Sequence, residues 1–199
     1  GVLEPAPPGG PLFRWTADDA ARAGLLDALG AASAEIEGLY RHGDTAERRA
    51  VLRWIGLLPD GHPLAAPATE LVEDALRAND PRLVAAALGP WAIRNLEAPV
   101  LRPAVLKCVS LGIPLSGLAE LGQRGGPELA RVLAGHAHEQ IAAGRAVPDD
   151  IWPLVHRHPP ADVLAAIEAE LEHPVAARRR AARSALDASS AAVAQSRRC

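Results

Sequence analysis

The chain has 199 residues, a formal net charge of −3 at pH 7 and only 3% aromatic residues. This length allows one domain with a hydrophobic core, and the nearly balanced charge argues against a nucleic-acid-binding protein. Because the sequence is rich in Ala, Leu, Arg and Glu, it predicts an all-α fold and argues against a large sheet.

The N-terminal end combines a proline- and glycine-rich arm with the start of the first helix. Residues 1–12 are expected to be flexible, and residues 13–188 are expected to form a single helical domain. Thr16 is a suitable N-cap, because Asp18 and Asp19 then lie in the first turn and match the helix dipole. The helix is expected to run to Leu29, and its inward side chains to be Ala20, Leu25, Leu26 and Leu29.

Further helices are predicted over residues 31–40, 45–58 and 70–78, and the last of these ends at a well-defined boundary. Asn79 can close one helix, Asp80 can cap the next, and Pro81 fits the first position of the second helix. Two helices are therefore expected to meet here with almost no loop.

The remaining chain predicts short helices separated by proline and glycine, over residues 81–88, 91–96, 127–143, 151–157, 161–172 and 174–188. A further helix is expected to start at Pro99 or at Arg102-Pro103 and to end at Gly112 and Pro114. Helices of roughly 8 to 16 residues joined by tight turns are typical of stacked antiparallel helical hairpins. We therefore expect a HEAT- or armadillo-like α-solenoid or an irregular bundle. Residues 189–199 have little apolar surface to bury and are expected to fray.

Lys107 is the only lysine, while the 20 other basic residues are arginine. This bias suggests that an amine is needed at this position. Helical periodicity places Lys107 at the edge of an apolar face with Cys108 at its centre. Two interpretations of Lys107 remain open: its stem covers the core while the ammonium reaches water, or the side chain lines a pocket. Cys108 is expected to be an inert core thiol or, alternatively, a reactive one.

The segment Gly135-His-Ala-His-Glu139 has the composition of a metal site but not its spacing. His136 and His138 are two residues apart and point to opposite sides of a helix, so they cannot bind one ion together. His136 is expected to be a hydrogen-bonded core residue or a pocket residue. Glu139 lies at the boundary of the same face, and His138 points away from it.

Two other polar clusters have simple structural interpretations. His156 and His158 precede Pro159 and are expected to serve a helix end rather than a metal. The arginines from 178 to 180, together with Arg183, predict a solvated helix face, with a patch for an anionic partner as the alternative.

Several motifs are absent from the sequence, including the phosphate-binding loop, the dinucleotide fingerprint, H-E-x-x-H and G-x-S-x-G. The sequence thus argues against an NTPase, a dinucleotide enzyme or an α/β-hydrolase, and no cofactor or metal is expected. It also has neither an apolar run of membrane-spanning length nor a signal peptide, so we expect a cytoplasmic protein that does not span a membrane.

Residues 71–90, 104–114 and 137–139 together resemble the EboA family, over a region of roughly residues 45 to 155. The most specific pieces are Asn-Asp-Pro at 79–81 and Leu-Lys-Cys at 106–108. The matching positions are Asn79, Asp80, Lys107, Cys108, His138 and Glu139. His136 departs from the family, which has an aromatic residue there. The resemblance implies a small helical protein encoded beside a membrane prenyltransferase, a metal-dependent hydrolase and a sugar-phosphate-isomerase-like barrel, in a pathway that makes or exports specialised metabolites.

Two functions follow as hypotheses. The first is an accessory or adaptor protein that binds a pathway protein, such as the membrane prenyltransferase, or a prenyl-type intermediate, with Asn79, Asp80 and Cys108 near the ligand. The second is a small helical enzyme in which Lys107 works with His138 or His136 and with Glu139 in acid–base or phosphate chemistry.

Overall fold

The computed structural model describes residues 16–29, 33–116, 118 and 120–196. Within these ranges the regular structure is helical and contains no strand, which confirms the all-α prediction. A boundary after Glu120 divides the chain into two compact units, within the stretch for which we expected a single domain. A solenoid arrangement stays a prediction. Among the described helices, none has both the length and the apolar character that crossing a membrane requires.

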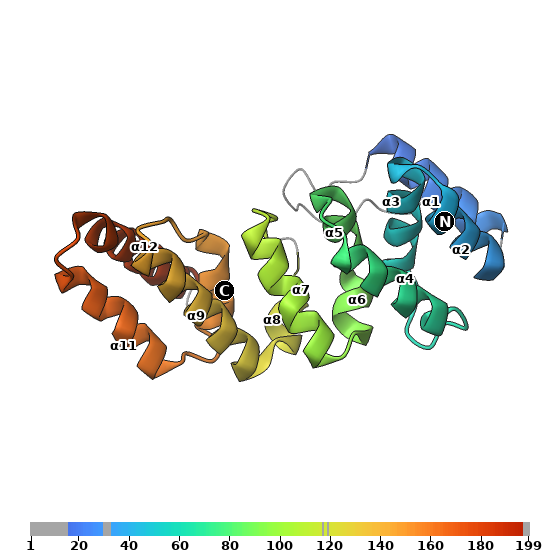
Figure 1. The fold of residues 1–199 in the computed structure, drawn as a ribbon. Helices are drawn as coiled ribbons and strands as arrows, with labels where there is room; N and C mark the ends of the chain where they lie inside the picture. The colour runs from blue at the N-terminus through green and yellow to red at the C-terminus, as the bar shows by residue number, and fades with distance from the viewer. Residues whose placement is uncertain (1–15, 30–32, 117, 119, 197–199) are drawn as a thin grey trace. The chain divides into compact units, whose positions relative to one another are not determined.

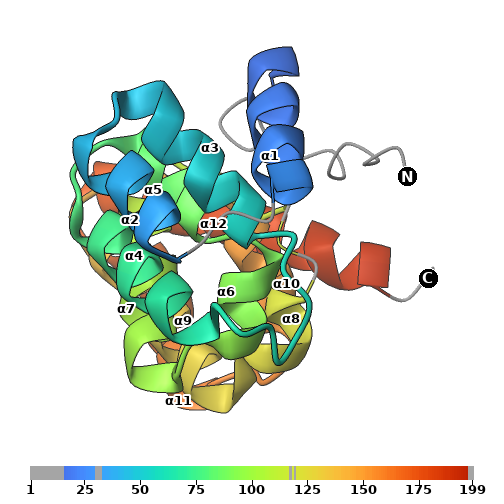
Figure 2. The same cartoon turned by 90° about the vertical axis from the view of Figure 1, so that its right-hand side faces the viewer.

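The first unit is built from short helices (Figure 1). Their bounds are α1 Ala17–Leu29, α2 Ser33–His42, α3 Thr45–Ile55, α4 Ala65–Arg77, α5 Pro81–Ala87, α6 Pro90–Asn95 and α7 Ala98–Ser110. Helix α3 packs against α1, α2 and α5, and α2 also lies beside α4 (Figure 2).

Helix α5 is the most interior helix of this unit. All side chains from Leu83 to Leu88 are buried. Because residues 83–88 are apolar on every side, this part of the chain must be surrounded by other elements, and α5 contacts α3, α4 and α7. The core of the unit therefore lies around α5.

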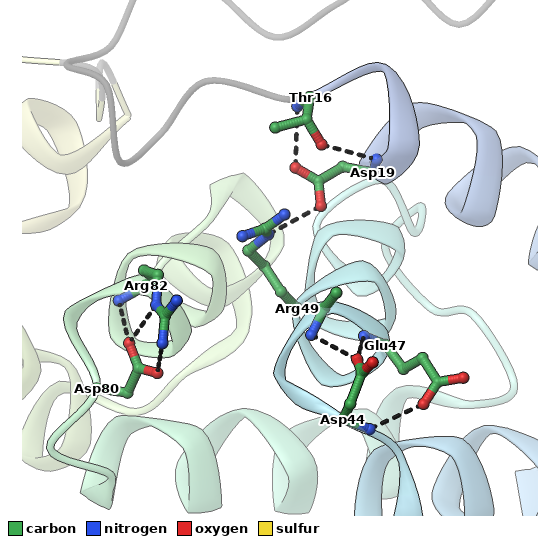
Figure 3. Close-up of polar contacts among 8 residues, drawn as sticks. Thr16, Asp19, Asp44, Glu47, Arg49, Asp80 and Arg82 are labelled. Carbon is green, nitrogen blue, oxygen red and sulfur yellow. Dashed lines mark hydrogen bonds and ion pairs between the residues drawn. The ribbon is translucent and has the colours of Figure 1, made fainter.

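Side-chain caps set the starts of three helices (Figure 3). Thr16 and Asp19 form a reciprocal capping box, in which each backbone N–H donates to the other side chain, at 2.9 and 3.0 Å. Asp44 and Glu47 form a second box at the start of α3. Asp80 caps α5 by accepting from the backbone N–H of Arg82, and Pro81 occupies the first turn. The predicted caps Thr16 and Asp80 are thus confirmed.

The inward face of α1 differs from our expectation. Leu26 is buried as predicted, but Ala20 is exposed and Leu25 is 65% exposed. The buried positions are Asp19, Ala23 and Leu26, because the Asp19 carboxylate turns toward α3 and meets Arg49 there. The side chain of Leu29 lies outside the described residues.

The second unit is built around the long helix α9. Its elements are α8 Leu121–Arg124, α9 Gly126–Ala142, η1 Asp149–Ile151, α10 Trp152–Val155, α11 Ala161–Ala169, η2 Glu170–Glu172 and α12 Ala176–Ser196. Helix α9 packs against α10, α11 and α12. Leu133, Ile141 and Trp152 are fully buried between these helices.

The C-terminal segment contains the last helix. Helix α12 continues to Ser196 and so includes residues 189–196, for which fraying stays a prediction. Ser189 and Ala192 are buried, and the Nε2 atom of His156 lies 2.7 Å from the hydroxyl oxygen of Ser189. The segment is helical because a partner from α10 and an apolar contact surface hold it. The expected arm at residues 1–12 and residues 197–199 lie outside the described residues.

Candidate functional site

Lys107 extends from α7 to the end of α4. Its Nζ atom donates a hydrogen bond to the backbone carbonyl of Leu76 at 2.8 Å. The last carbonyls of a helix lack intrahelical partners and carry partial negative charge. The ammonium of Lys107 satisfies one of these carbonyls, so its position is fixed by the end of α4.

Beside Lys107 lies a groove of about 260 Å³ between α4 and α7, here named the α4–α7 groove. Its apolar lining residues are Leu76, Pro99, Val100, Pro103 and Ala104, and its charged lining residues are Glu73, Arg77 and Lys107. Lys107 is half-buried in this setting. The groove thus offers apolar walls with charged groups beside them.

A larger hollow of about 500 Å³, the α2–α4 cavity, is polar. It is lined by Tyr40, Arg41, Arg48, Glu70, Leu71, Glu73, Asp74 and Arg77. Glu73 and Arg77, four residues apart on α4, line both this cavity and the α4–α7 groove. The two hollows are therefore neighbours along α4.

A hydrogen-bond network organises the α2–α4 cavity. The Tyr40 hydroxyl donates to Asp74 at 2.9 Å, and Arg48 donates to the Tyr40 oxygen at 3.2 Å. The Arg48 guanidinium carbon lies 4.7 Å from the Tyr40 ring centroid, and Arg77 lies 3.5 Å from Asp74. Burial, assisted by the Asp74 carboxylate, raises the pKa of Tyr40, so its hydroxyl remains a hydrogen-bond donor near neutral pH.

The sequence analysis did not identify this network. Tyr40 and Asp74 are separated by 34 residues, and no short motif connects them. One signal was available: Tyr40 is the only tyrosine of the chain. A single phenol on an otherwise aliphatic helix face indicates a specific polar partner, because a buried hydroxyl needs one.

Asn79, Asp80 and Cys108 occupy three different environments. Asn79 is exposed in the turn between α4 and α5. Both carboxylate oxygens of Asp80 accept from the Arg82 side chain, and this hydrogen bonding lowers the pKa of Asp80. Cys108 is fully buried, and burial raises its pKa to about 12, so it is a thiol rather than a thiolate at neutral pH. Ligand binding by these three residues stays a prediction.

The predicted histidines and Glu139 lie on α9, in the second unit. His138 is half-buried, and its Nε2 atom lies 3.4 Å from a Glu170 carboxylate oxygen. Glu170 also accepts from Arg178, and this hydrogen bond is the main reason that the pKa of Glu170 is lowered. Glu139 is exposed and His136 is half-buried. The carboxylate next to His138 is therefore Glu170, and acid–base roles for His136, His138 and Glu139 stay predictions.

The part of the chain that the structure describes contains no group of three or more His, Cys, Asp and Glu side chains arranged to hold a metal ion. Polar chemistry in the first unit is instead concentrated in arginine, carboxylate and tyrosine side chains along α4. These groups can form hydrogen bonds to a polar ligand, while the α4–α7 groove can accept an apolar one.

Comparison with known proteins identifies the family. A protein-family model described as "Metabolite traffic protein EboA" matches residues 9–156. The match contains the stretches 71–90, 104–114 and 137–139 and extends further toward the N-terminus than the resemblance noted from the sequence. No curated protein and no solved structure matches the chain. Because the family match covers well over half of its residues, the chain belongs to the EboA family.

Proposed function

We propose that this EboA-family protein is an accessory protein that carries an intermediate of a metabolite pathway, with the apolar part of the intermediate in the α4–α7 groove. The family description as a metabolite traffic protein supports a pathway role. The observation that carries the proposal is the lining of the groove, in which Leu76, Val100 and Pro103 stand beside the charged Arg77 and Lys107. An intermediate with a hydrocarbon chain, such as a prenyl-type compound, suits this combination.

The energetics favour an apolar chain in the groove. Apolar surface removed from water contributes about 25 cal/mol per Å², so a short hydrocarbon chain that covers the groove gains several kcal/mol before the entropy loss of binding. Carrying such a compound between enzymes is useful because its chain is poorly soluble in water. The recipient would be a pathway enzyme, such as the membrane prenyltransferase that the family resemblance implies.

Catalysis by Lys107 is the alternative function, and the contacts support it less well. The Lys107 ammonium donates to the Leu76 carbonyl, a contact that holds it at the end of α4. His138 has Glu170 as its neighbour, and Glu139 is exposed. The position of Lys107 suits the edge of a binding groove, and the position of His138 suits a structural contact with Glu170.

Filling the groove tests the carrier function. The Val100→Trp variant places an indole in the groove, whereas Val163→Trp adds the same bulk at a half-exposed site on α11 in the second unit. We expect 1-octanol to bind the wild type and Val163→Trp alike, and to bind Val100→Trp at least about tenfold more weakly. Isothermal titration calorimetry measures the affinities, and native mass spectrometry of protein from a pathway-containing host identifies the carried compound. Equal binding by Val100→Trp, or no binding to the wild type, contradicts the proposal.

The Lys107→Arg variant separates carriage from catalysis. Arginine keeps the positive charge and can still donate to the Leu76 carbonyl, but it cannot act as an amine base or nucleophile. For a carrier, we expect metabolite output in a host that depends on this protein to stay near the wild-type level. Loss of output by a folded Lys107→Arg protein supports catalysis instead.

A further inference from the structure

The α2–α4 cavity combines opposite charges in equal number. Three arginines, Arg41, Arg48 and Arg77, and three carboxylates, Glu70, Glu73 and Asp74, line it. We propose that this cavity binds an uncharged, polyhydroxylated group, and that this group is the head of the ligand whose chain lies in the α4–α7 groove. The location of the chain rests on the proposed function above, whereas the chemistry of the head rests on the cavity alone.

The charge balance selects an uncharged head. A phosphate or carboxylate would meet the arginines favourably but would also lie near the three carboxylates, and a cation would have the converse difficulty. A hydroxyl group both donates and accepts hydrogen bonds. A ring or chain with several hydroxyls can donate to carboxylates and accept from guanidinium groups at the same time, which matches this lining.

The network around Tyr40 gives the cavity a fixed polar wall. The Tyr40 hydroxyl, the Asp74 carboxylate and the Arg48 guanidinium are joined by hydrogen bonds and a stacking contact. The Nε atom of Arg48 is buried and lacks a hydrogen-bond partner among the described residues. A buried donor without an acceptor is unfavourable, so the guanidinium gains if it reorients toward a ligand oxygen.

The shared residues connect this cavity to the groove. Glu73 and Arg77 line both hollows and lie one turn apart on α4. A ligand that crosses α4 at this pair can place its head in the polar cavity and its chain along Val100 and Pro103. The site therefore fits an amphiphile with a neutral polyol head.

Three probes with the same chain distinguish the head groups. They are n-octyl β-D-glucoside, n-octyl phosphate and 1-octanol, each titrated by calorimetry below its micelle concentration. Two or three additional hydrogen bonds raise affinity by about tenfold or more, so we expect the glucoside to bind at least about tenfold more tightly than 1-octanol. Tighter binding of the phosphate than of the glucoside, or equal binding of glucoside and 1-octanol, overturns the proposal.

A charge-neutral double variant assigns the preference to the cavity. Arg41→Ala with Glu70→Ala removes one donor group and one acceptor group from exposed positions of the lining. Glu168→Ala with Arg183→Ala makes the same change at exposed positions of the second unit. We expect only the first pair to reduce glucoside binding to the 1-octanol level, and to leave 1-octanol binding unchanged. A glucoside preference that survives in the first pair overturns the assignment.

Methyl β-D-glucoside tests the cavity without the groove, because it lacks the chain. If methyl β-D-glucoside binds the wild type and binds the Arg41 and Glu70 double variant more weakly, the head-group site is supported. This holds even if 1-octanol fails to bind, and in that case only the carrier proposal is lost. In the opposite outcome, Val100→Trp abolishes 1-octanol binding, but neither glucoside binds more tightly than 1-octanol. That result supports the carrier proposal and overturns the head-group proposal.

Discussion

Asp19 performs two structural tasks with one carboxylate. One oxygen accepts from the Thr16 backbone N–H and completes the capping box of α1, and the other accepts from the Arg49 side chain of α3 at 2.8 Å. The residue is only 1% exposed. Nearby Arg53 is buried as well, and burial, which outweighs the attraction of Asp19, lowers its pKa to about 10. The attachment of α1 to α3 therefore depends on an ionised Asp19.

The dependence of the free energy of unfolding on pH should reveal the contribution of the ionised Asp19 carboxylate. Burial raises the pKa of Asp19, but hydrogen bonds from Thr16 and Arg49 together lower it below the ordinary value of 3.8. The folded state thus binds the proton less readily than the unfolded state, so the stabilisation is complete above about pH 3.8 and is lost as the pH falls further. We expect Asp19→Asn to lower the free energy of unfolding by about 1 to 3 kcal/mol at neutral pH and to flatten its decline in acid.

Urea denaturation at neutral pH and near pH 3 measures this difference. Asp18→Asn is the matched control, because Asp18 lies in the same first turn but is exposed. It loses only the weak interaction with the helix dipole, worth about 0.3 to 1 kcal/mol. If both variants lose the same stability and keep the same decline in acid, the role assigned to Asp19 is contradicted.

At the scale of elements, the corner between α4 and α5 depends on a single cap. Asp80 accepts from the Arg82 backbone N–H at 2.9 Å, and its side-chain pairing with Arg82 is largely exposed. Replacing a cap residue by alanine lowers stability by about 1 kcal/mol, while exposed ion pairs contribute little. We expect Asp80→Ala to lower the free energy of unfolding by about this amount and Asp80→Asn to have a much smaller effect, because asparagine also caps helices. Chemical denaturation compares the two variants, and equal losses would point to the ion pair instead of the cap.

The starts of α1 and α5 could be predicted from the sequence because their capping signals are local, whereas α4, which has no side-chain cap, begins at Ala65 and not at residue 70 as expected. Thr16 and Asp80 bond to backbone atoms within three residues, and Pro81 fixes its own backbone angle. The position of Lys107 at the edge of an apolar face was likewise accessible from helical periodicity. These features require no knowledge of which helices meet.

The faces of helices and the candidate site could not be predicted in the same way. Leu25 was expected to be inward but is exposed, and Asp19 is buried instead. The partner of Asp19 is Arg49, which lies 30 residues further along the chain. Tyr40 and Asp74 are 34 residues apart, and His138 and Glu170 are 32 apart. Side chains from distant helices decide these pairings. A lone tyrosine can indicate that a polar partner exists, but no local signal in a single sequence shows which residue that partner is.

At the scale of the molecule, the two compact units differ in how their helices are held. The first unit surrounds the apolar α5, whereas the second depends on contacts of α12 with α9, α10 and the two short 3₁₀ helices. The end of α12 contributes Ser189, which pairs with His156, and the buried Ala192. Burial lowers the pKa of His156, so the neutral ring that pairs with Ser189 persists at neutral pH. The final turns of α12 are thus part of the second unit.

Truncation after residue 188 tests this dependence. It removes the hydrogen bond between His156 and Ser189 and the contact of Ala192, a loss of about 1 to 2 kcal/mol, which corresponds to roughly tenfold faster exchange of amides that open with this unit. We expect hydrogen exchange, followed by mass spectrometry, to accelerate in peptides from α9, α10 and α12 but not in α5. Truncation after residue 196 is the matched control and should leave exchange unchanged, since it keeps all of α12. Equal acceleration in α5 would show that the units open together, and no acceleration in α9 would show that the end of α12 adds no stability to its unit.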